Sequence, residues 1–341
     1  MSSVIQVAPL PATGPWPTVD PFLFCVHHND RFPRSNGQLC PAAPLSGRAL
    51  GNDFSNIDGW NMYHGRTVPG FPQHPHRGFE TITFVQRGLI DHADSLGAVA
   101  RYGEGDVQWM TAGAGIVHAE MFPLLDEVEP NPMDMFQIWL NLPRADKMAT
   151  PYFEMLWADG IPHVIEVDGN GCITEITVAA GALGDAHPPS PPPDSWASKD
   201  VSDIAIWHIR IDPGGSWVIP PAAGADTVRI LYVVEGDGTA GVESAALPGR
   251  HAAQLDASVG TPLRAGEHGL RALLLQGRPI AEPVAQYGPF VMNDRAGIEQ
   301  AFRDYQRTGF GGWPWPSDDP TNGFGHQRFA RRPNGDTETA P

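Results

Sequence analysis

The chain has 341 residues, and 22 basic against 39 acidic side chains give it a formal net charge of −17. A chain this acidic is repelled by phosphate backbones, so we expect no direct binding of nucleic acid. Its 38 glycines and 35 prolines exclude a helical bundle and favour many short strands joined by turns.

The first 150 residues have the pattern of an all-β unit. Residues 1–20 are apolar but interrupted by four prolines, which is typical of an extended arm. From residue 21 to residue 151, runs rich in β-branched and aromatic side chains alternate with glycine-rich turns. Examples of these predicted strands are residues 80–86, 106–110 and 135–142.

The second half of the chain continues this pattern after an interruption. Residues 183–203 are rich in proline, serine and aspartate, and we expect an exposed insertion there. Strand patterning resumes at residue 204 and continues to about residue 276. Residues 294–308 carry apolar side chains at helical spacing, which predicts a short helix with Asp294 as its N-cap and Gly309 as its stop.

Two internal matches indicate that the chain contains a repeated unit. The segment ETITFVQRG at residues 80–88 aligns with VRILYVVEG at residues 228–236, and TAG at 111–113 aligns with RAG at 264–266. Two related all-β units follow from these matches. Because a closed barrel has no exposed strand edges, we expect each unit to form a small barrel.

Two triplets in the first unit carry residues that can bind a metal. They are His74-Pro75-His76 and His118-Ala119-Glu120. In a strand, residues i and i+2 point to the same face, so each triplet projects two ligand-capable side chains into one space. Three imidazoles and one carboxylate suit iron(II), manganese, nickel, copper or zinc. The alternative is that these histidines lie in turns or on the surface.

The internal alignment predicts that only the first unit binds metal. It places Ala222 and Gly224 opposite the two histidines of the first triplet, and Arg271 and Leu273 opposite the ligands of the second. None of these four residues offers a side-chain lone pair to a metal at neutral pH, because arginine stays protonated. We therefore expect one metal ion per chain.

Five segments of the chain resemble the pirin family of bicupin proteins. They are HPHRGFETITF (74–84), HADSLGA (92–98), GDVQWMTAGAGIVHAE (105–120), FQIWLNLP (136–143) and EPVAQYGPFVMN (282–293). The resemblance runs from about residue 20 to residue 312. It implies an all-β fold of two cupin-type, jelly-roll β-barrels placed face to face, with one iron in the first barrel. The metal-ligand pattern of the family falls on His74, His76, His118 and Glu120.

The resemblance also divides the chain into three parts. Residues 1–160 are the predicted metal-binding cupin domain, and residues 161–293 are a cupin domain without metal ligands that contains the insertion 183–203. Residues 294–341 form a short helix and an irregular tail. Residues 33–60 look like a second insertion relative to the family.

The function that the resemblance implies is that of a quercetin 2,3-dioxygenase-type oxidoreductase. A flavonol would coordinate the iron through its 3-hydroxyl, and dioxygen would open the ring with release of carbon monoxide. Glu120 is the predicted acceptor of the hydroxyl proton. The alternative is a non-enzymatic, redox-responsive regulator that acts through a protein partner. A cupin isomerase acting on sugar phosphates is disfavoured, because the chain is acidic and has no cluster of basic side chains.

Four polar residues near the triplets have less specific expectations. Glu80 either orients a metal ligand or belongs to the core, and Arg77 either binds an anionic substrate oxygen or lies solvated at the rim. His92 and Asp94 are expected to be structural residues that form hydrogen bonds.

Cysteine usage and hydropathy predict the compartment. The three cysteines, Cys25, Cys40 and Cys172, are widely spaced, so we expect neither a disulfide framework nor a cysteine-based zinc site. The first basic residue is Arg31, so the charged region of a signal peptide is missing, and no apolar run approaches 18 residues. We therefore expect a cytoplasmic protein that does not span a membrane.

Overall fold

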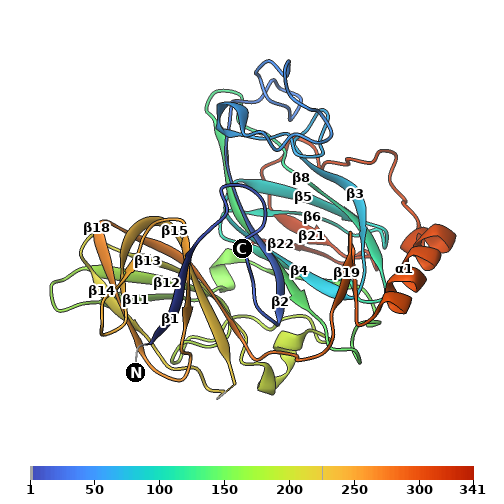
Figure 1. Cartoon of the computed structure of the whole chain (residues 1–341). Helices are drawn as coiled ribbons and strands as arrows, with labels where there is room; N and C mark the ends of the chain where they lie inside the picture. The colour runs from blue at the N-terminus through green and yellow to red at the C-terminus, as the bar shows by residue number, and fades with distance from the viewer. Residues whose placement is uncertain (1–2, 225) are drawn as a thin grey trace. The chain divides into compact units, whose positions relative to one another are not determined.

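The computed structural model shown in Figure 1 describes residues 3–224 and 226–341. Most of its regular structure is β-strand, and the described residues contain one α-helix, α1 (Arg295–Thr308). The predicted all-β class and carboxyl-terminal helix are therefore confirmed. The chain forms two compact units. The histidine unit comprises Val26–Ala158 and Glu282–Pro341, and the companion unit comprises Met1–Cys25 and Asp159–Ala281. In the described part of the chain, no helix is long and apolar enough to cross a bilayer.

Two antiparallel sheets build the histidine unit. The first has the strand order β10-β7-β4-β9-β2, and the second has the order β22-β21-β6-β5-β8-β3. The strands of the first sheet are β2 (Phe22–Phe32, whose first residues belong to the companion unit), β4 (Phe79–Arg87), β7 (Val107–Thr111), β9 (Asn131–Asn141) and β10 (Tyr152–Leu156). The strands of the second sheet are β3 (Gly70–His76), β5 (Leu89–Asp94), β6 (Val99–Gly103), β8 (Ile116–Met121), β21 (Phe329–Arg331) and β22 (Thr337–Thr339).

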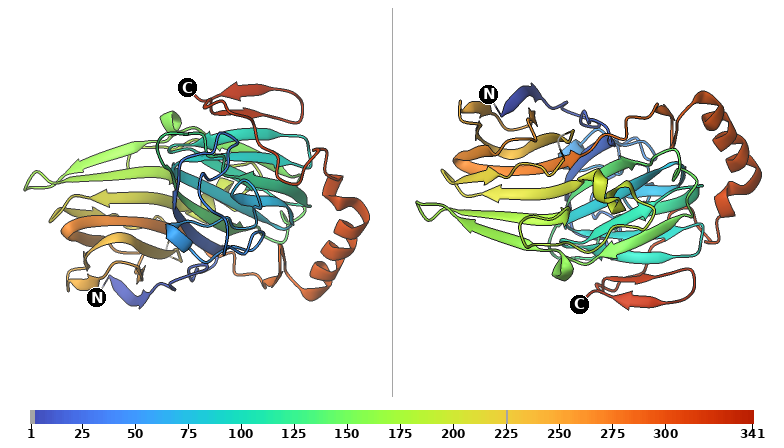
Figure 2. Two further views of the ribbon diagram at one scale, coloured as in Figure 1. Left: turned by 90° about the horizontal axis from the view of Figure 1, so that it is seen from above. Right: turned by 90° about the horizontal axis from the view of Figure 1, so that it is seen from below.

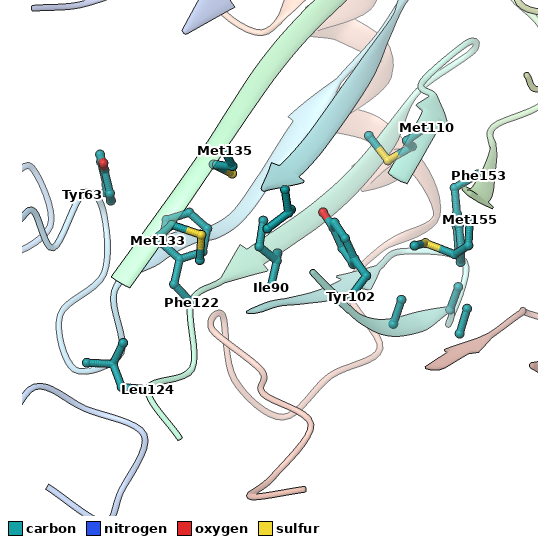
Figure 3. Packing of buried hydrophobic residues seen from close by; sticks show 14 of the residues in the cluster. Tyr63, Ile90, Tyr102, Met110, Phe122, Leu124, Met133, Met135, Phe153 and Met155 are labelled. Atoms are coloured by element: carbon teal, nitrogen blue, oxygen red, sulfur yellow. The ribbon is translucent and has the colours of Figure 1, made fainter. Parts of the chain in front are cut away.

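The histidine unit is a two-layered sandwich and not the closed barrel that the sequence predicted. The two sheets share no strand. Both contribute side chains to one apolar core, with Met110, Met135 and Phe153 from the first sheet and Ile90 and Tyr102 from the second. Figure 3 shows these residues packed together. Of the four edge strands, β22 is only three residues long, and a short edge offers little template for pairing.

The companion unit contains one sheet that bends over itself. Its strand order is β1-β17-β15-β18-β13-β12-β11, while β14 also pairs with β18 and β16 with β15. Because β1 and β11 end this path, the sheet is not a closed barrel either. Its strands are β1 (Val4–Pro9), β11 (His163–Val167), β12 (Ile173–Ala180), β13 (Ala205–Ile211), β14 (Ser216–Ile219), β15 (Val228–Ala240), β16 (Ala245–Leu247), β17 (His251–Leu255) and β18 (Thr261–Gly277).

A bulge between the two longest strands allows the companion sheet to bend. The pairing of β15 with β18 jumps from Gly236 opposite Leu270 to Gly238 opposite Ala265, which leaves residues 266–269 out of that ladder. Bulges of this kind bend the strand that carries them. The apolar core of the unit lies on one face of these strands and includes Leu231, Val233, Ala272 and Leu274 in addition to Ala265 and Leu270.

The strand pairing corrects one half of the internal alignment. In the histidine unit, Thr111 lies opposite Glu80, and in the companion unit Leu255 lies opposite Arg229. The counterpart of residue 111 is therefore close to residue 255 and not residue 264, because a three-residue match is too short to fix a register. In the companion unit, β14 pairs with the start of β18 in the same way as β3 pairs with β8 in the histidine unit. Their sequences, SWVI and TPLRA, contain no histidine and no carboxylate.

The compact units are discontinuous in sequence, whereas the predicted domains 1–160, 161–293 and 294–341 are continuous. In the companion unit, β1 pairs with β17. In the histidine unit, the carboxyl-terminal segment adds the hairpin β19 (Ala285–Tyr287) and β20 (Phe290–Met292), helix α1, and strand β21, which pairs with β6. Figure 2 shows the red β21–β22 hairpin along the edge of the teal strands.

The predicted caps of the helix are confirmed. The side chain of Asp294 accepts a hydrogen bond of 2.8 Å from the backbone N–H of Gly297. Gly309 ends the helix in the left-handed conformation, with φ of 55°, where glycine is favoured.

Candidate metal centre

Strands β3 and β8 bring three histidines of the two triplets together. The strands are antiparallel neighbours, and His74 lies directly opposite His118. One ring nitrogen each from His74, His76 and His118 form a group whose atoms all lie within 4.8 Å of one another. The ring centroids are 4.5 Å apart for His74 and His118, 4.7 Å for His74 and His76, and 5.0 Å for His76 and His118. Cross-strand pairing and side-chain alternation along β3 explain this meeting.

Several nitrogens of this cluster are buried without a hydrogen-bond partner. They are both ring nitrogens of His118 and the Nδ1 of His76. His118 is completely buried, and His76 is 4% exposed. A buried polar atom without a partner costs free energy, and native proteins rarely keep such atoms without a reason. A metal ion coordinated by one nitrogen of each ring would supply a partner to His76 Nδ1 and to one of the two His118 nitrogens, so the residues fit a metal.

The three imidazoles are held in the neutral form that binds metals. Burial lowers the pKa of all three, and for His76 and His118 the pKa lies well below the ordinary histidine value. The Nδ1 of His74 lies 2.8 Å from the backbone carbonyl of Pro72, so this nitrogen carries the proton and donates it. The Nε2 of His74 is then left with its lone pair, which is the tautomer that a metal ligand needs.

Glu120 lies beside the three-histidine group but not within it. It is 1% exposed and stands two residues after His118 on β8. Its Oε1 accepts hydrogen bonds from Thr83 Oγ1 at 2.9 Å and from the Tyr102 hydroxyl at 3.2 Å. Its Oε2 accepts a hydrogen bond of 2.8 Å from the Nε2 of Gln137. Strands β4, β6 and β9 thus fix the orientation of a carboxylate next to the histidines.

Among the other predicted neighbours, His92 and Asp94 lie beside the cluster. The Nε2 of His92 is 3.2 Å from an oxygen of Asp94, so these two residues form the expected hydrogen bond. The ring of His92 is also 5.6 Å from that of His118. Glu80 is fully buried and accepts a hydrogen bond of 2.7 Å from the Thr111 hydroxyl, and it does not belong to the three-histidine group.

Arg77 has neither of its two expected roles. It is 5% exposed, its Nη1 donates to Asp304 of α1 at 2.9 Å, and its Nε donates to the carbonyl of Ala114 at 2.7 Å. Its guanidinium carbon also lies 4.5 Å from the ring centre of Phe310. The residue after His76 therefore anchors the carboxyl-terminal segment and does not face solvent.

Lys147 holds the turn that follows the first triplet. Its Nζ donates to the carbonyl of Gly78 and to the Oδ1 of Asn141, both at 2.8 Å, and to the carbonyl of Val291 at 3.3 Å. Gly78 has a φ of 84°, and a Cβ at this position would lie 2.0 Å from the Val291 carbonyl oxygen. Only glycine fits there.

Little in the sequence pointed to these supporting residues. Thr83, Tyr102 and Gln137 lie in ordinary strand patterns, and the partners of Arg77 and Lys147 are more than 60 residues away for all but Asn141 and Ala114. The available signal was Gln137, a polar residue within the apolar run FQIWL of a buried strand.

Comparison with known proteins gives the family. Residues 12–140 match the pirin family model, and residues 206–311 match the model of the pirin C-terminal cupin domain. The chain belongs to the pirin family. A pirin-like protein of Solanum lycopersicum is 36% identical over 271 residues, which cover 76% of this chain and 84% of the relative.

Two further members of the comparison are named for an enzymatic activity. A protein of Pseudomonas aeruginosa named "Putative quercetin 2,3-dioxygenase" is 37% identical over 240 residues, covering 70% of this chain and 79% of the relative. The crystal structure of quercetin 2,3-dioxygenase from Acinetobacter baumannii superposes with a TM-score of 0.71 and 26% identity, covering 92% of this pirin-family chain and 99% of that protein.

Proposed function

We propose that this pirin-family protein is a metal-dependent dioxygenase of the quercetin 2,3-dioxygenase type. The observation that carries the proposal is the group of three neutral imidazoles on β3 and β8, two of which are buried and keep unpaired nitrogens. The names of the Pseudomonas and Acinetobacter proteins support a flavonol as substrate and dioxygen as co-substrate. Iron as the native metal and the cytoplasm as its location are part of the same proposal.

In this proposal His74, His76, His118 and Glu120 hold the metal. When bound, the iron supplies Lewis-acid polarisation of the flavonol 3-hydroxyl. The half-buried His74 is the most accessible of the three histidines, and the ring of Phe71 lies 6.4 Å from it, so a planar substrate approaches along this side. The buried positions of His76 and His118 exclude water from the opposite side.

Glu120 is the proposed acceptor of the substrate's hydroxyl proton. A general base has to be held within hydrogen-bond reach of the proton it removes. Thr83 and Tyr102 donate to Oε1 and Gln137 donates to Oε2, so the carboxylate is oriented before the substrate arrives.

Dioxygen uptake on quercetin, measured together with the metal content, tests the proposal. In Glu120→Gln, turnover should fall by roughly 10²–10⁴-fold, the usual contribution of a general base, while the metal content falls much less. Glu80→Gln is the matched control, because Glu80 is an equally buried glutamate whose hydrogen-bond partner is Thr111. Unchanged flavonol oxidation in Glu120→Gln at normal metal loading would exclude Glu120 as the base. Flavonol binding without dioxygen uptake, combined with redox-dependent affinity for a protein partner, would favour the regulatory alternative.

A further inference from the structure

The companion unit contains a pocket of about 380 Å³ that none of the chemistry above uses. Its walls come from β12, β13, β15 and β18, and every lining residue belongs to the companion unit. The volume lies within the range of about 300–1,000 Å³ that is usual for small-molecule sites. Both apolar and charged side chains line it: Ile173, Ile211, Pro213 and Leu270, with Glu175, Arg210, Asp212, Glu235, His268 and Arg271.

Four charged residues form a row across this pocket. On neighbouring strands, Glu175 lies opposite Arg210, Arg210 opposite Arg271, and Arg271 opposite Glu235. Their neighbours along the strands, Ile209 and Ala272 among them, belong to the apolar core, so the row lies on the other face of the sheet. Like charges directly opposite each other destabilise a sheet, because their Cβ atoms are only about 5 Å apart. The row therefore has one unfavourable pair of arginines at its centre, with a carboxylate on the outer side of each arginine.

The charges of the row are unequally paired. Arg271 donates to Glu235 at 2.9 Å through Nη1 and to the Nε2 of His208 at 3.0 Å through Nε, so its side chain, which is 9% exposed, is fixed in place. Glu175 lies 3.1 Å from His163. Arg210, by contrast, has no hydrogen bond or ion pair with any residue that the structure describes. One guanidinium at the centre of the pocket is thus without a counter-ion.

The bulge of β18 supplies the rim of the pocket. Residues 266–269 leave the ladder with β15, and His268 within this segment is exposed. A Cβ at Gly236 would lie 2.0 Å from the carbonyl oxygen of Gly269, and Gly236 has a φ of 72°. The close approach of these two glycines fixes the bulge, and bulges often redirect a side chain toward a site. His268 in this segment also lines the pocket.

We propose that this pocket binds a small organic monocarboxylate, with its carboxylate on Arg210 and Arg271. The planar guanidinium group matches a carboxylate in two-pronged hydrogen bonding. Glu175, Asp212 and Glu235 also line the pocket and repel anions with two or more charges, so a single charge is favoured over phosphate. The apolar lining contacts the organic part of the ligand. The proposal does not depend on the dioxygenase function.

Titration of the full-length protein with benzoate tests this proposal, with inorganic phosphate as the comparison anion. Calorimetry should show saturable benzoate binding at one site per chain and weaker binding of phosphate. Arg210→Gln should raise the benzoate Kd at least tenfold. This variant should fold normally, because the Arg210 side chain is exposed and has no partner to lose.

Two controls separate this site from others. Arg264→Gln removes an exposed arginine of β18 that does not line the pocket, so benzoate affinity should stay unchanged. His118→Leu, which alters the histidine cluster, should also leave the benzoate affinity unchanged. This result would distinguish binding in the pocket from binding of the carboxylate to a metal at the cluster. Equal benzoate affinity in wild type and Arg210→Gln, the absence of saturable binding, or tighter binding of phosphate would each overturn the proposal.

Discussion

Replacing His118 by leucine should change the stability of the protein in opposite directions with and without metal. Both ring nitrogens of His118 are buried without a hydrogen-bond partner. Each such atom costs about 1–3 kcal/mol when no metal is bound. Leucine fills a similar volume and has no polar atom. The metal-free variant should therefore be more stable than the metal-free wild type, by about 1–3 kcal/mol after some loss of packing.

Metal should reverse this order. A ligand present at 100 times its Kd stabilises the protein that binds it by about 2.7 kcal/mol. The wild type should gain this free energy and His118→Leu should not, because one of the three clustered histidines is lost. The assay is urea or thermal unfolding of both proteins, in chelator and in excess iron(II). The quantity compared is the midpoint of the unfolding transition that metal shifts in the wild type.

His28→Leu is the control for this experiment. His28 is a buried histidine of the same unit, and its Nδ1 lies 2.8 Å from the Tyr63 hydroxyl. Its replacement removes a hydrogen bond, so the variant should be less stable than wild type in chelator and still be stabilised by metal. If metal-free His118→Leu is less stable than metal-free wild type, and metal stabilises neither protein, His118 is a core residue and the argument for a metal centre fails.

Three further predictions concern the same unit. Lys147→Met should lower the free energy of unfolding in urea by about 3 kcal/mol or more, because three buried acceptors lose their donor; an unchanged free energy of unfolding would contradict this role of Lys147. Burial raises the pKa of Asp30 from 3.8 to about 6, so the stability that its protonated form contributes is present below pH 4 and is lost as the pH rises through 6. This loss amounts to about 3 kcal/mol, and unfolding measured from pH 4 to pH 7 should show it in wild type but not in Asp30→Asn. Metal analysis should find one ion per chain and none in His74→Ala, and a value close to two would show a second centre.

The histidine cluster could be predicted because it depends on short-range rules. Side chains two residues apart in a strand share a face, and His74 and His76 obey this rule on β3. The cap and stop of α1 were predictable for the same reason, since Asp294 and Gly309 act within one turn of the helix. Such features require only a few consecutive residues.

Features that depend on long-range pairing could not be predicted from the sequence. The prediction of closed barrels was wrong because closure depends on which strands become edges. The β21–β22 hairpin joins its sheet through the pairing of β21 with β6, a strand more than 220 residues earlier. The match of TAG with RAG failed because sequence similarity over three residues does not determine strand register. The sequence predicts that Arg77 binds a substrate oxygen or lies in solvent. It does not reveal the ion pair with Asp304, because that partner is 227 residues away.

The carboxyl-terminal segment supports the turn beside the candidate metal centre. The turn after His76 is held by Arg77 on Asp304 and by Lys147, which joins Gly78 to Val291. We expect contacts between segments so distant in sequence to form late in folding, because closing a long loop costs conformational entropy before the contact stabilises the chain. A chain lacking residues 282–341 would therefore keep both triplets in its sequence and lose the contacts that position the first of them. If the cluster binds metal as proposed, we expect the smallest fragment that binds it to include residues 282–341 as well as residues 1–160.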